Sequence, residues 1–140
     1  MLILTRKIDA QIRTAGEDGY PNECCGALFG EADGDTRTVS EIFPIANARE
    51  SDEQYHRFVI TPEDFMRAEL EARRQGLDVV GIYHSHPDHP AEPSEYDREH
   101  ALPFYSYIIV SVEKGTSENL TSWELSADRE KFTREVISWL

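Results

Sequence analysis

The stretch from His84 to Asp97 constrains this 140-residue chain more than any other feature. It reads HSHPDHPAEPSEYD, which places two imidazoles one residue apart and a carboxylate eleven residues beyond the second. The preceding run, Leu77–Tyr83, is largely apolar and rich in β-branched residues, so it predicts a buried strand. Side chains two residues apart on a strand share a face, and His84 and His86 can therefore reach one metal ion together.

These side chains match the donor set of an open zinc site. Zinc in proteins is held by neutral imidazole nitrogens and carboxylate oxygens, and catalytic sites keep three protein ligands with a water in the fourth position. We therefore predict that His84, His86 and Asp97 bind Zn²⁺. An ion bound in this way lowers the pKa of its water toward about 7, which favours hydrolysis at neutral pH.

The residues from Ser94 to Asp97 also have the pattern of a helix start. Ser94 follows Pro93 and precedes an acid three residues on, which is close to a capping box with Asp in place of the usual Glu or Gln. Capping alone explains this tetrapeptide without any metal. One geometry can also serve both purposes, because a helix that begins directly after the loop turns its first-turn carboxylate back toward the strand end.

Hydrolysis further requires a general base that is not itself a ligand, and Glu23 is the candidate. It is the only acid in the apolar run ECCGALFG, which ends at Gly30. A carboxylate beside that much apolar surface costs free energy unless a charge partner or a function compensates. A strand-end glutamate in solvent is the alternative interpretation, and the residues alone leave both open.

Composition limits the partners that we expect. The chain has 27 acidic and 14 basic residues, a formal net charge of −13, and no cluster of Lys and Arg of the kind that neutralises phosphates. We therefore expect no nucleic-acid partner. The acidic surface is consistent with ordinary solubility, or with a protein partner that carries a basic patch.

The sequence also bears on location and on redox chemistry. No apolar stretch approaches the roughly 18 residues of a membrane span, and the N-terminus places apolar residues before its charges, unlike a signal peptide. We therefore expect a cytoplasmic protein with no membrane partner. Cys24 and Cys25 are adjacent and too few for a disulfide framework, so they are expected to pack as small core hydrophobes.

Patterning along the rest of the chain predicts one α/β (α+β) domain over residues 1–140, with helices packed against a mixed sheet. The expected elements are a helix over 6–17, strands over 23–30 and 36–45, a short strand over 57–60, a helix over 61–76, a short helix over 94–101, and strands over 105–112 and 120–125. Phe65, Met66 and Leu70 are predicted to form the buried face of the second long helix. Residues 128–140 remain open between a helix and a terminal strand.

Taken together, these residues resemble the JAMM/MPN metalloproteases, whose pattern is a glutamate upstream of His-x-His-x7-Ser-x2-Asp. Every position of that pattern is filled in this chain, by Glu23, His84, His86, Ser94 and Asp97. The resemblance spans residues 20–112 and implies a mixed sheet flanked by helices, like that of cytidine deaminases. It also implies Zn²⁺ on the two histidines and the aspartate. Glu23 would be the general acid/base, and Ser94 would steady the tetrahedral intermediate.

Within that family, the segments YPNECCG and GIYHSHPDHP look most like those of the small stand-alone bacterial members. Those proteins cleave just after the C-terminal Gly-Gly of ubiquitin-like sulfur-carrier proteins related to ThiS and MoaD, and release cysteine or a short C-terminal extension. The resemblance therefore implies a sulfur-carrier protein as the substrate.

Several alternatives stay open beside this interpretation. They are a deubiquitinase-like isopeptidase acting on lysine conjugates, a non-catalytic MPN scaffold, and a non-haem iron oxygenase, which also uses two histidines and one carboxylate. The oxygenase does not require the upstream Glu or the spaced Ser, and inactive scaffolds usually lack one or more ligands. His56, His89 and His100 are predicted to be non-ligands, although His100 can contact a ligand and His89 can meet substrate.

Overall fold

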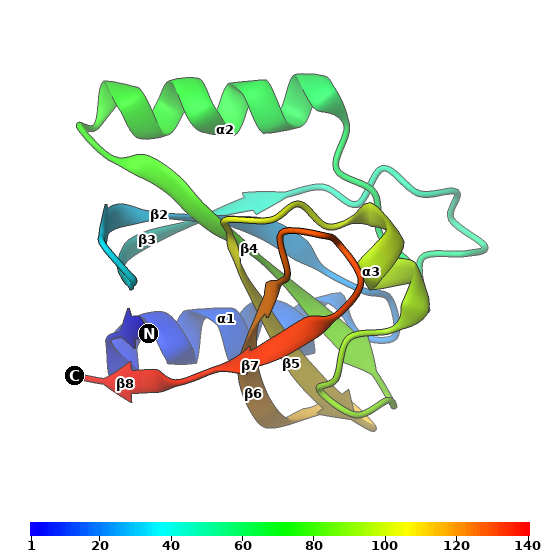
Figure 1. The fold of residues 1–140 in the computed structure, drawn as a ribbon. Helices are drawn as coiled ribbons and strands as arrows, with labels where there is room; N and C mark the ends of the chain where they lie inside the picture. The colour runs from blue at the N-terminus through cyan, green and yellow to red at the C-terminus, as the bar shows by residue number, and fades with distance from the viewer.

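Eight strands and three helices make up the computed structural model, which describes all 140 residues (Figure 1). The strands are β1 (Leu2–Leu4), β2 (Cys25–Asp33), β3 (Thr36–Ile45), β4 (Asp78–Pro87), β5 (Ser106–Glu113), β6 (Thr116–Leu125), β7 (Phe132–Glu135) and β8 (Ile137–Trp139). The helices are α1 (Arg6–Gly19), α2 (Pro62–Arg74) and α3 (Glu95–His100).

All eight strands belong to one mixed sheet, in the order β7-β6-β5-β4-β2-β3-β1-β8. The central pair β4 and β5 is parallel, β2 is antiparallel to both β3 and β4, and β1 is parallel to β3 and β8. The predicted fold class, a mixed sheet with helices against it, is therefore confirmed.

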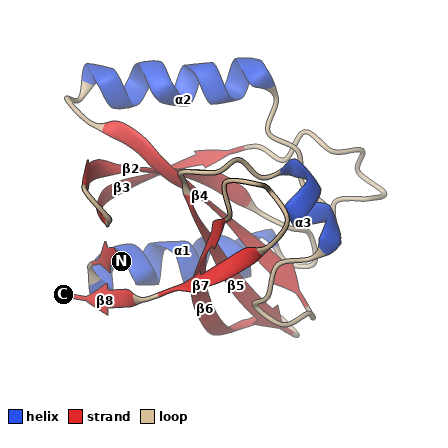
Figure 2. Ribbon diagram, viewed as in Figure 1, coloured by secondary structure: helices blue, strands red, loops and turns tan.

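The two long helices cover opposite faces of the sheet (Figure 2). Ile8 and Ile12 of α1 pack in one apolar cluster with Leu28 of β2, while Ala68 and Ala72 of α2 pack in the other. Neighbouring residues of β2 divide between the two clusters because successive side chains of a strand point to opposite faces. No helix has both the length and the apolar character needed to cross a membrane.

The predicted buried face of α2 is wrong in part. Met66 and Leu70 are 61% and 57% exposed, whereas Ala68 and Ala72 are fully buried. Phe65 shares their helical stripe and packs partly buried against the same cluster. Because alanine side chains are small, the helix backbone can approach the sheet closely on that face. The larger side chains of Met66 and Leu70 then lie on the face that points toward solvent.

Two other predictions about local structure need correction. Residues 57–60 form no strand. The backbone groups on either side of Phe58, the carbonyl of Arg57 and the N–H of Val59, bond to the side-chain amide of Asn47 and not to the backbone of a neighbouring strand. The open segment 128–140 forms strands, β7 and β8, and no helix. The short strand β1, with Leu2 and Leu4 fully buried, was not expected from the sequence.

Gly26 provides a test of the packing directly behind the site. It lies opposite Tyr83 across β2 and β4, and a Cβ atom at Gly26 would stand 2.4 Å from atoms of that buried ring. We expect Gly26→Ala to lower the free energy of unfolding by about 1–3 kcal/mol, as overpacked cores do. Denaturant melts measure this change. Tyr83→Leu removes the far ring atoms, so in that background the cost of Gly26→Ala should largely vanish, and an equal cost in both backgrounds would contradict the explanation.

Candidate metal centre

Strand β4 carries both predicted histidine ligands, and it is longer than the sequence indicated. Its parallel pairing with β5 continues through His84 and His86 to Pro87, which lies opposite Val112. The two imidazoles therefore lie on the strand itself, one residue apart and on one face, and both are buried, with 1% and 6% exposure. Regular backbone pairing, and not a loose loop, fixes their direction.

Helix α3 brings the third predicted ligand to the same place. Ser94 caps the helix: its hydroxyl oxygen accepts from the N–H of Asp97 at 3.0 Å, while Oδ2 of Asp97 accepts from the N–H of Ser94 at 2.9 Å. The capping box predicted from the sequence is therefore present, with Asp in the acid position. It turns the Asp97 carboxylate inward, and this side chain is 7% exposed.

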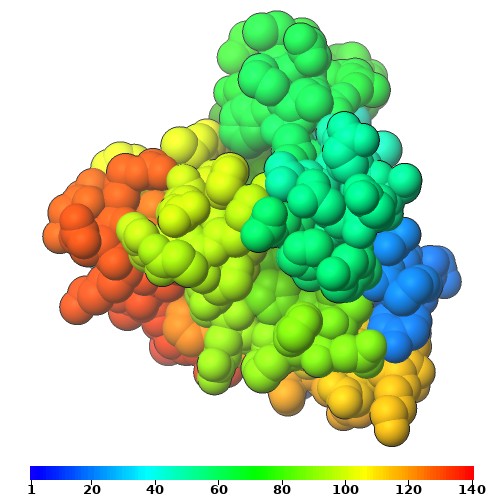
Figure 3. All heavy atoms as spheres, turned by 90° about the vertical axis from the view of Figure 1, so that its right-hand side faces the viewer, coloured from blue at the N-terminus to red at the C-terminus, as the bar shows by residue number.

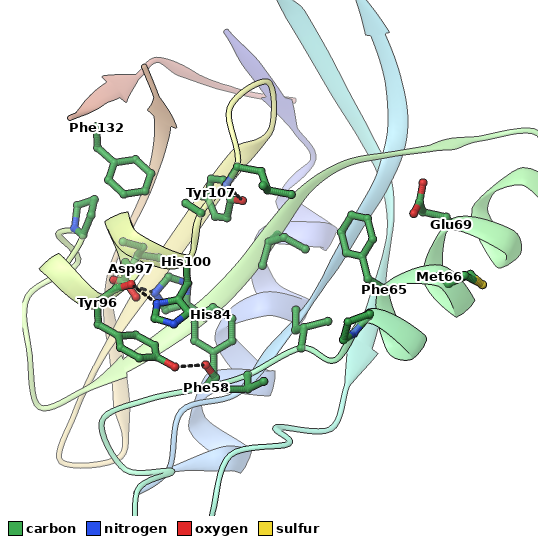
Figure 4. A pocket seen from close by; sticks show the side chains of 18 residues that line it. Phe58, Phe65, Met66, Glu69, His84, Tyr96, Asp97, His100, Tyr107 and Phe132 are labelled. Atoms are coloured by element: carbon green, nitrogen blue, oxygen red, sulfur yellow. Dashed lines mark hydrogen bonds and ion pairs between the residues drawn. The ribbon is translucent and has the colours of Figure 1, made fainter. Parts of the chain in front are cut away.

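Three donor atoms converge at this point, and Figure 4 shows two of the side chains that supply them, His84 and Asp97. Nε2 of His84 lies 3.1 Å from Nε2 of His86, and Oδ2 of Asp97 lies 3.3 and 3.1 Å from these two nitrogens. A tetrahedral zinc ion with bonds of about 2.0–2.1 Å would hold neighbouring ligand atoms roughly 3.3 Å apart. The spacing and chemistry of the three donors therefore fit such an ion.

The surroundings fix the ring orientation of His86 and favour the neutral form of His84. Nδ1 of His86 lies 2.8 Å from the carbonyl of Pro90, which fixes the ring proton on Nδ1 and leaves the Nε2 lone pair facing the cluster. Burial lowers the pKa of His84, so this imidazole is neutral. Burial alone would raise the pKa of Asp97, but the adjacent imidazoles of His84 and His86 hold it well below its usual range.

Glu23 lies beside this cluster and is buried, with 6% exposure, so the interpretation as a solvent-exposed strand end is wrong. Burial raises its pKa to about 8, a protonated His86 would oppose that rise, and the negative charge of Asp97 adds to it. Its Oε1 atom is buried and has no hydrogen-bond partner. A carboxyl group with a pKa near neutrality can both accept and return a proton, as a general acid/base must.

The geometry also admits a second donor set, because ligand atoms of Glu23, His84 and His86 all lie within 4.8 Å of one another. We favour Asp97 as the third donor for two reasons. Its carboxylate lies within 3.3 Å of both Nε2 atoms, and the helix cap anchors it, whereas Oε1 of Glu23 has no hydrogen-bond partner.

The other predicted side chains lie outside the cluster. Ser94 is exposed, and because its oxygen already accepts from Asp97, its hydroxyl proton is free to donate. His89 is exposed, while His100 stacks on Tyr96 with ring centroids 4.0 Å apart. The His56 ring lies at a tilt against Tyr55, with centroids 4.2 Å apart and planes 47° apart. None of these three histidines belongs to the group that can hold a metal.

An apolar pocket of about 390 Å³ adjoins the cluster, and His84 and Asp97 form part of its wall (Figure 4). Its other walls come from Phe58, Phe65 of α2 and Phe132 of β7, so residues far apart in the sequence meet here. The sequence carried no signal for it. Figure 3 shows the face of the molecule on which the segment 46–60 and the segment around α3 approach each other.

Comparison with known proteins gives a consistent picture. A family model described as prokaryotic homologs of the JAB domain matches residues 5–126. The chain is 39% identical over 92 residues to a desampylase of Haloferax volcanii, covering 65% of this chain and 63% of that protein. It is 33% identical over 73 residues to a probable TtuB-protein conjugate cleaving protease of Thermus thermophilus, covering 52% and 48%. The matches thus span less than two thirds of the length of these relatives.

Solved structures agree with the fold over the whole chain. A solution structure of a protein from Desulfitobacterium hafniense has a TM-score of 0.87 at 31% identity, covering 100% of this chain and 93% of that one. A structure described as a metalloprotease-like zinc site, JAMM, in the proteasome and signalosome has a TM-score of 0.59 at 17% identity, covering 100% and 98%. At that identity the second likeness concerns the fold alone.

Proposed function

Because this chain belongs to the prokaryotic JAB-domain family, with the JAMM/MPN fold, we propose that it is a zinc-dependent metallopeptidase. Its proposed reaction is hydrolysis of the amide bond after the C-terminal Gly-Gly of a ubiquitin-like, ThiS/MoaD-like sulfur carrier, with release of cysteine or a short extension. The observation that carries the proposal is the convergence of His84, His86 and Asp97 on one point beside the buried carboxyl group of Glu23.

The chemistry follows from the positions of these side chains. Zinc held by His84, His86 and Asp97 would supply a Lewis acid and lower the pKa of a water molecule. Glu23 takes the proton of the attacking water and returns it to the leaving amine, a role suited to its pKa of about 8. The free hydroxyl proton of Ser94 is available to the oxyanion that forms on the substrate carbonyl.

The apolar pocket supports an extended peptide tail as the substrate. Glycines allow a backbone to approach a metal site closely, because they carry no side chain to clash with its walls. A bulkier apolar side chain next to the Gly-Gly pair can enter the pocket lined by Phe58 and Phe65. The pocket therefore suits a chain that ends in glycines and carries apolar residues before them.

The decisive test is incubation of the zinc-loaded protein with sulfur carriers extended beyond Gly-Gly by cysteine or a dipeptide. We expect intact mass spectrometry to show the carrier shortened to Gly-Gly. The relative described as a conjugate-cleaving protease favours a second candidate, cleavage of lysine isopeptide bonds, so a carrier joined to lysine is included. Cleavage of that conjugate alone would favour the second candidate, and no cleavage of either substrate would favour a scaffold.

Metal analysis addresses the remaining alternative. Zinc-dependent turnover without oxygen is the expected result, since hydrolysis consumes only water. Substantial iron in the purified protein, together with oxygen-dependent turnover, would instead identify an oxygenase that uses the same three side chains.

Ser94 gives a prediction that separates helix capping from catalysis. Ser94→Ala loses both the cap and the hydroxyl donor, so we expect kcat to fall about 100-fold and stability to fall by about 1 kcal/mol. Ser94→Asp keeps a good capping residue without a hydroxyl donor, and Ser94→Thr keeps both. Steady-state kinetics and thermal melts should show normal stability with low kcat for Ser94→Asp, and near-normal behaviour for Ser94→Thr. A fully active Ser94→Asp protein would exclude the proposed donor role.

A further inference from the structure

Both backbone polar groups of Glu23 pair with the segment 46–60, which contains no helix or strand. The N–H of Glu23 donates to the carbonyl of Gln54 at 2.7 Å, and its carbonyl accepts from Nδ2 of Asn47 at 3.2 Å. Glu23 itself precedes β2, which begins at Cys25. The position of the Glu23 carboxyl group, whose Oε1 atom has no hydrogen-bond partner, therefore depends on this loop as well as on the sheet.

The side chain of Asn47 organises that loop. Its Nδ2 donates to the carbonyls of Glu23 and Arg57, at 3.2 and 2.9 Å, and its Oδ1 accepts from the N–H groups of Arg49 and Val59, at 3.0 and 3.1 Å. Both amide donors and both lone pairs of the oxygen are thus used. The reversed amide would set its NH₂ group against two N–H donors, so the network itself fixes the orientation.

The Asn47 amide is also connected to His84, by way of Phe58. Its bonds to Arg57 and Val59 hold the two residues that flank this phenylalanine. The Phe58 ring stacks on His84 with centroids 4.6 Å apart and planes 28° apart, and its carbonyl accepts from the hydroxyl of Tyr96 at 3.3 Å. Asn47 therefore links the backbone of Glu23 to the packing against one predicted zinc ligand.

We infer that Asn47 is a positioning residue: its amide holds Glu23 where the carboxyl group faces the cluster. This role rests on the proposed hydrolysis being the function of the protein. An amide is required at this position, because an aspartate of the same shape has no donor and would direct negative charge at the carbonyls of Glu23 and Arg57. The three predicted ligands lie on β4 and α3, so the loop that contains Asn47 supplies none of them, and we expect the ion to bind without the Asn47 amide.

The test compares wild type with Asn47→Asp, both as zinc-loaded chains of residues 1–140. We expect kcat for carrier cleavage to fall roughly 10- to 100-fold, as displaced catalytic groups cause, while KM stays within about threefold. Zinc content should equal that of wild type. The matched control is Asn119→Asp, the same change at an exposed position of β6, which should leave kcat, KM and zinc content unchanged.

A second measurement does not depend on activity or on metal. In metal-free protein, hydrogen exchange of the Glu23 amide reports its bond to Gln54. We expect this amide to exchange at least about tenfold faster in Asn47→Asp than in wild type, and at the wild-type rate in Asn119→Asp. Exchange at the same rate in all three proteins would overturn the inference, whatever the substrate proves to be.

The kinetic outcomes keep the two proposals apart. If wild type cleaves the carrier, Glu23→Gln does not, and Asn47→Asp keeps full kcat, the positioning role is wrong and the proposed function stands. If wild type cleaves nothing, the proposed function fails and amide exchange decides the role of Asn47.

Should Asn47→Asp not fold, Gln54→Ala removes the side-chain bonds to the carbonyls of Asn47 and Arg49. Its kcat should fall severalfold at unchanged KM, and an unchanged kcat would overturn the inference.

Discussion

Glu23→Gln protein is expected to bind zinc as wild type does and to hydrolyse its substrate about a thousandfold more slowly. Glutamine has nearly the shape of glutamate, so the buried position beside His86 is filled without a cavity. Its amide cannot take a proton from water and return it to an amine, which is the step assigned to Glu23. Metal analysis and initial rates on the same samples separate loss of chemistry from loss of the ion.

The matched control is Glu31→Gln, which makes the same change at an exposed position of β2 and should retain the full rate. Wild-type turnover by Glu23→Gln would contradict the assignment of the base. Loss of zinc from Glu23→Gln would be equally informative, because it would identify Glu23, His84 and His86 as the ligand set, which the distances also admit.

His84→Ala is expected to reduce zinc affinity by well over 100-fold and hydrolysis to the background rate. Replacing a residue that only hydrogen-bonds to a metal ligand typically lowers metal affinity about 10- to 100-fold. Removal of a ligand itself should therefore lower the affinity further. His84 is 1% exposed, and no neighbouring histidine can take its place on β4. Competition with a chromophoric chelator measures the affinity.

His89→Ala is the control for that experiment, because it removes an exposed imidazole from the loop that follows the same strand. Its zinc affinity should match that of wild type. Stoichiometric zinc in His84→Ala at micromolar chelator would show that the ion binds elsewhere and would remove the basis of the proposed reaction.

The parts of the site that the sequence predicted share one property: they are local. The alternation of His84 and His86 and the capping pattern of Ser94 and Asp97 each depend on a few adjacent residues, and the structure contains both. The resemblance to the JAMM/MPN pattern then implied that these two segments and Glu23 meet at one site. Burial of Glu23 was left open, because it depends on a loop more than twenty residues away.

The features that the sequence did not predict depend on contacts between distant segments. The strand expected at residues 57–60 is replaced by bonds to Asn47, ten residues or more earlier in the chain. Met66 and Leu70 of α2 are exposed because Ala68 and Ala72 let the opposite side of the helix pack closely on the sheet. The pocket beside His84 has walls from α2, α3 and β7, and no local pattern encodes such a surface.

The division of the donors between β4 and α3 has a mechanical consequence. Two of them belong to a strand in the centre of the sheet, whereas Asp97 belongs to a helix of six residues that is held by its cap and by side-chain bonds of Tyr96 and Arg98 to other segments. An ion shared by these donors would join the two parts, and its binding free energy would resist their separation. Binding of the proposed ion would therefore couple the position of α3 to the central strand β4, and removal of the ion should raise hydrogen exchange in α3 more than in β4.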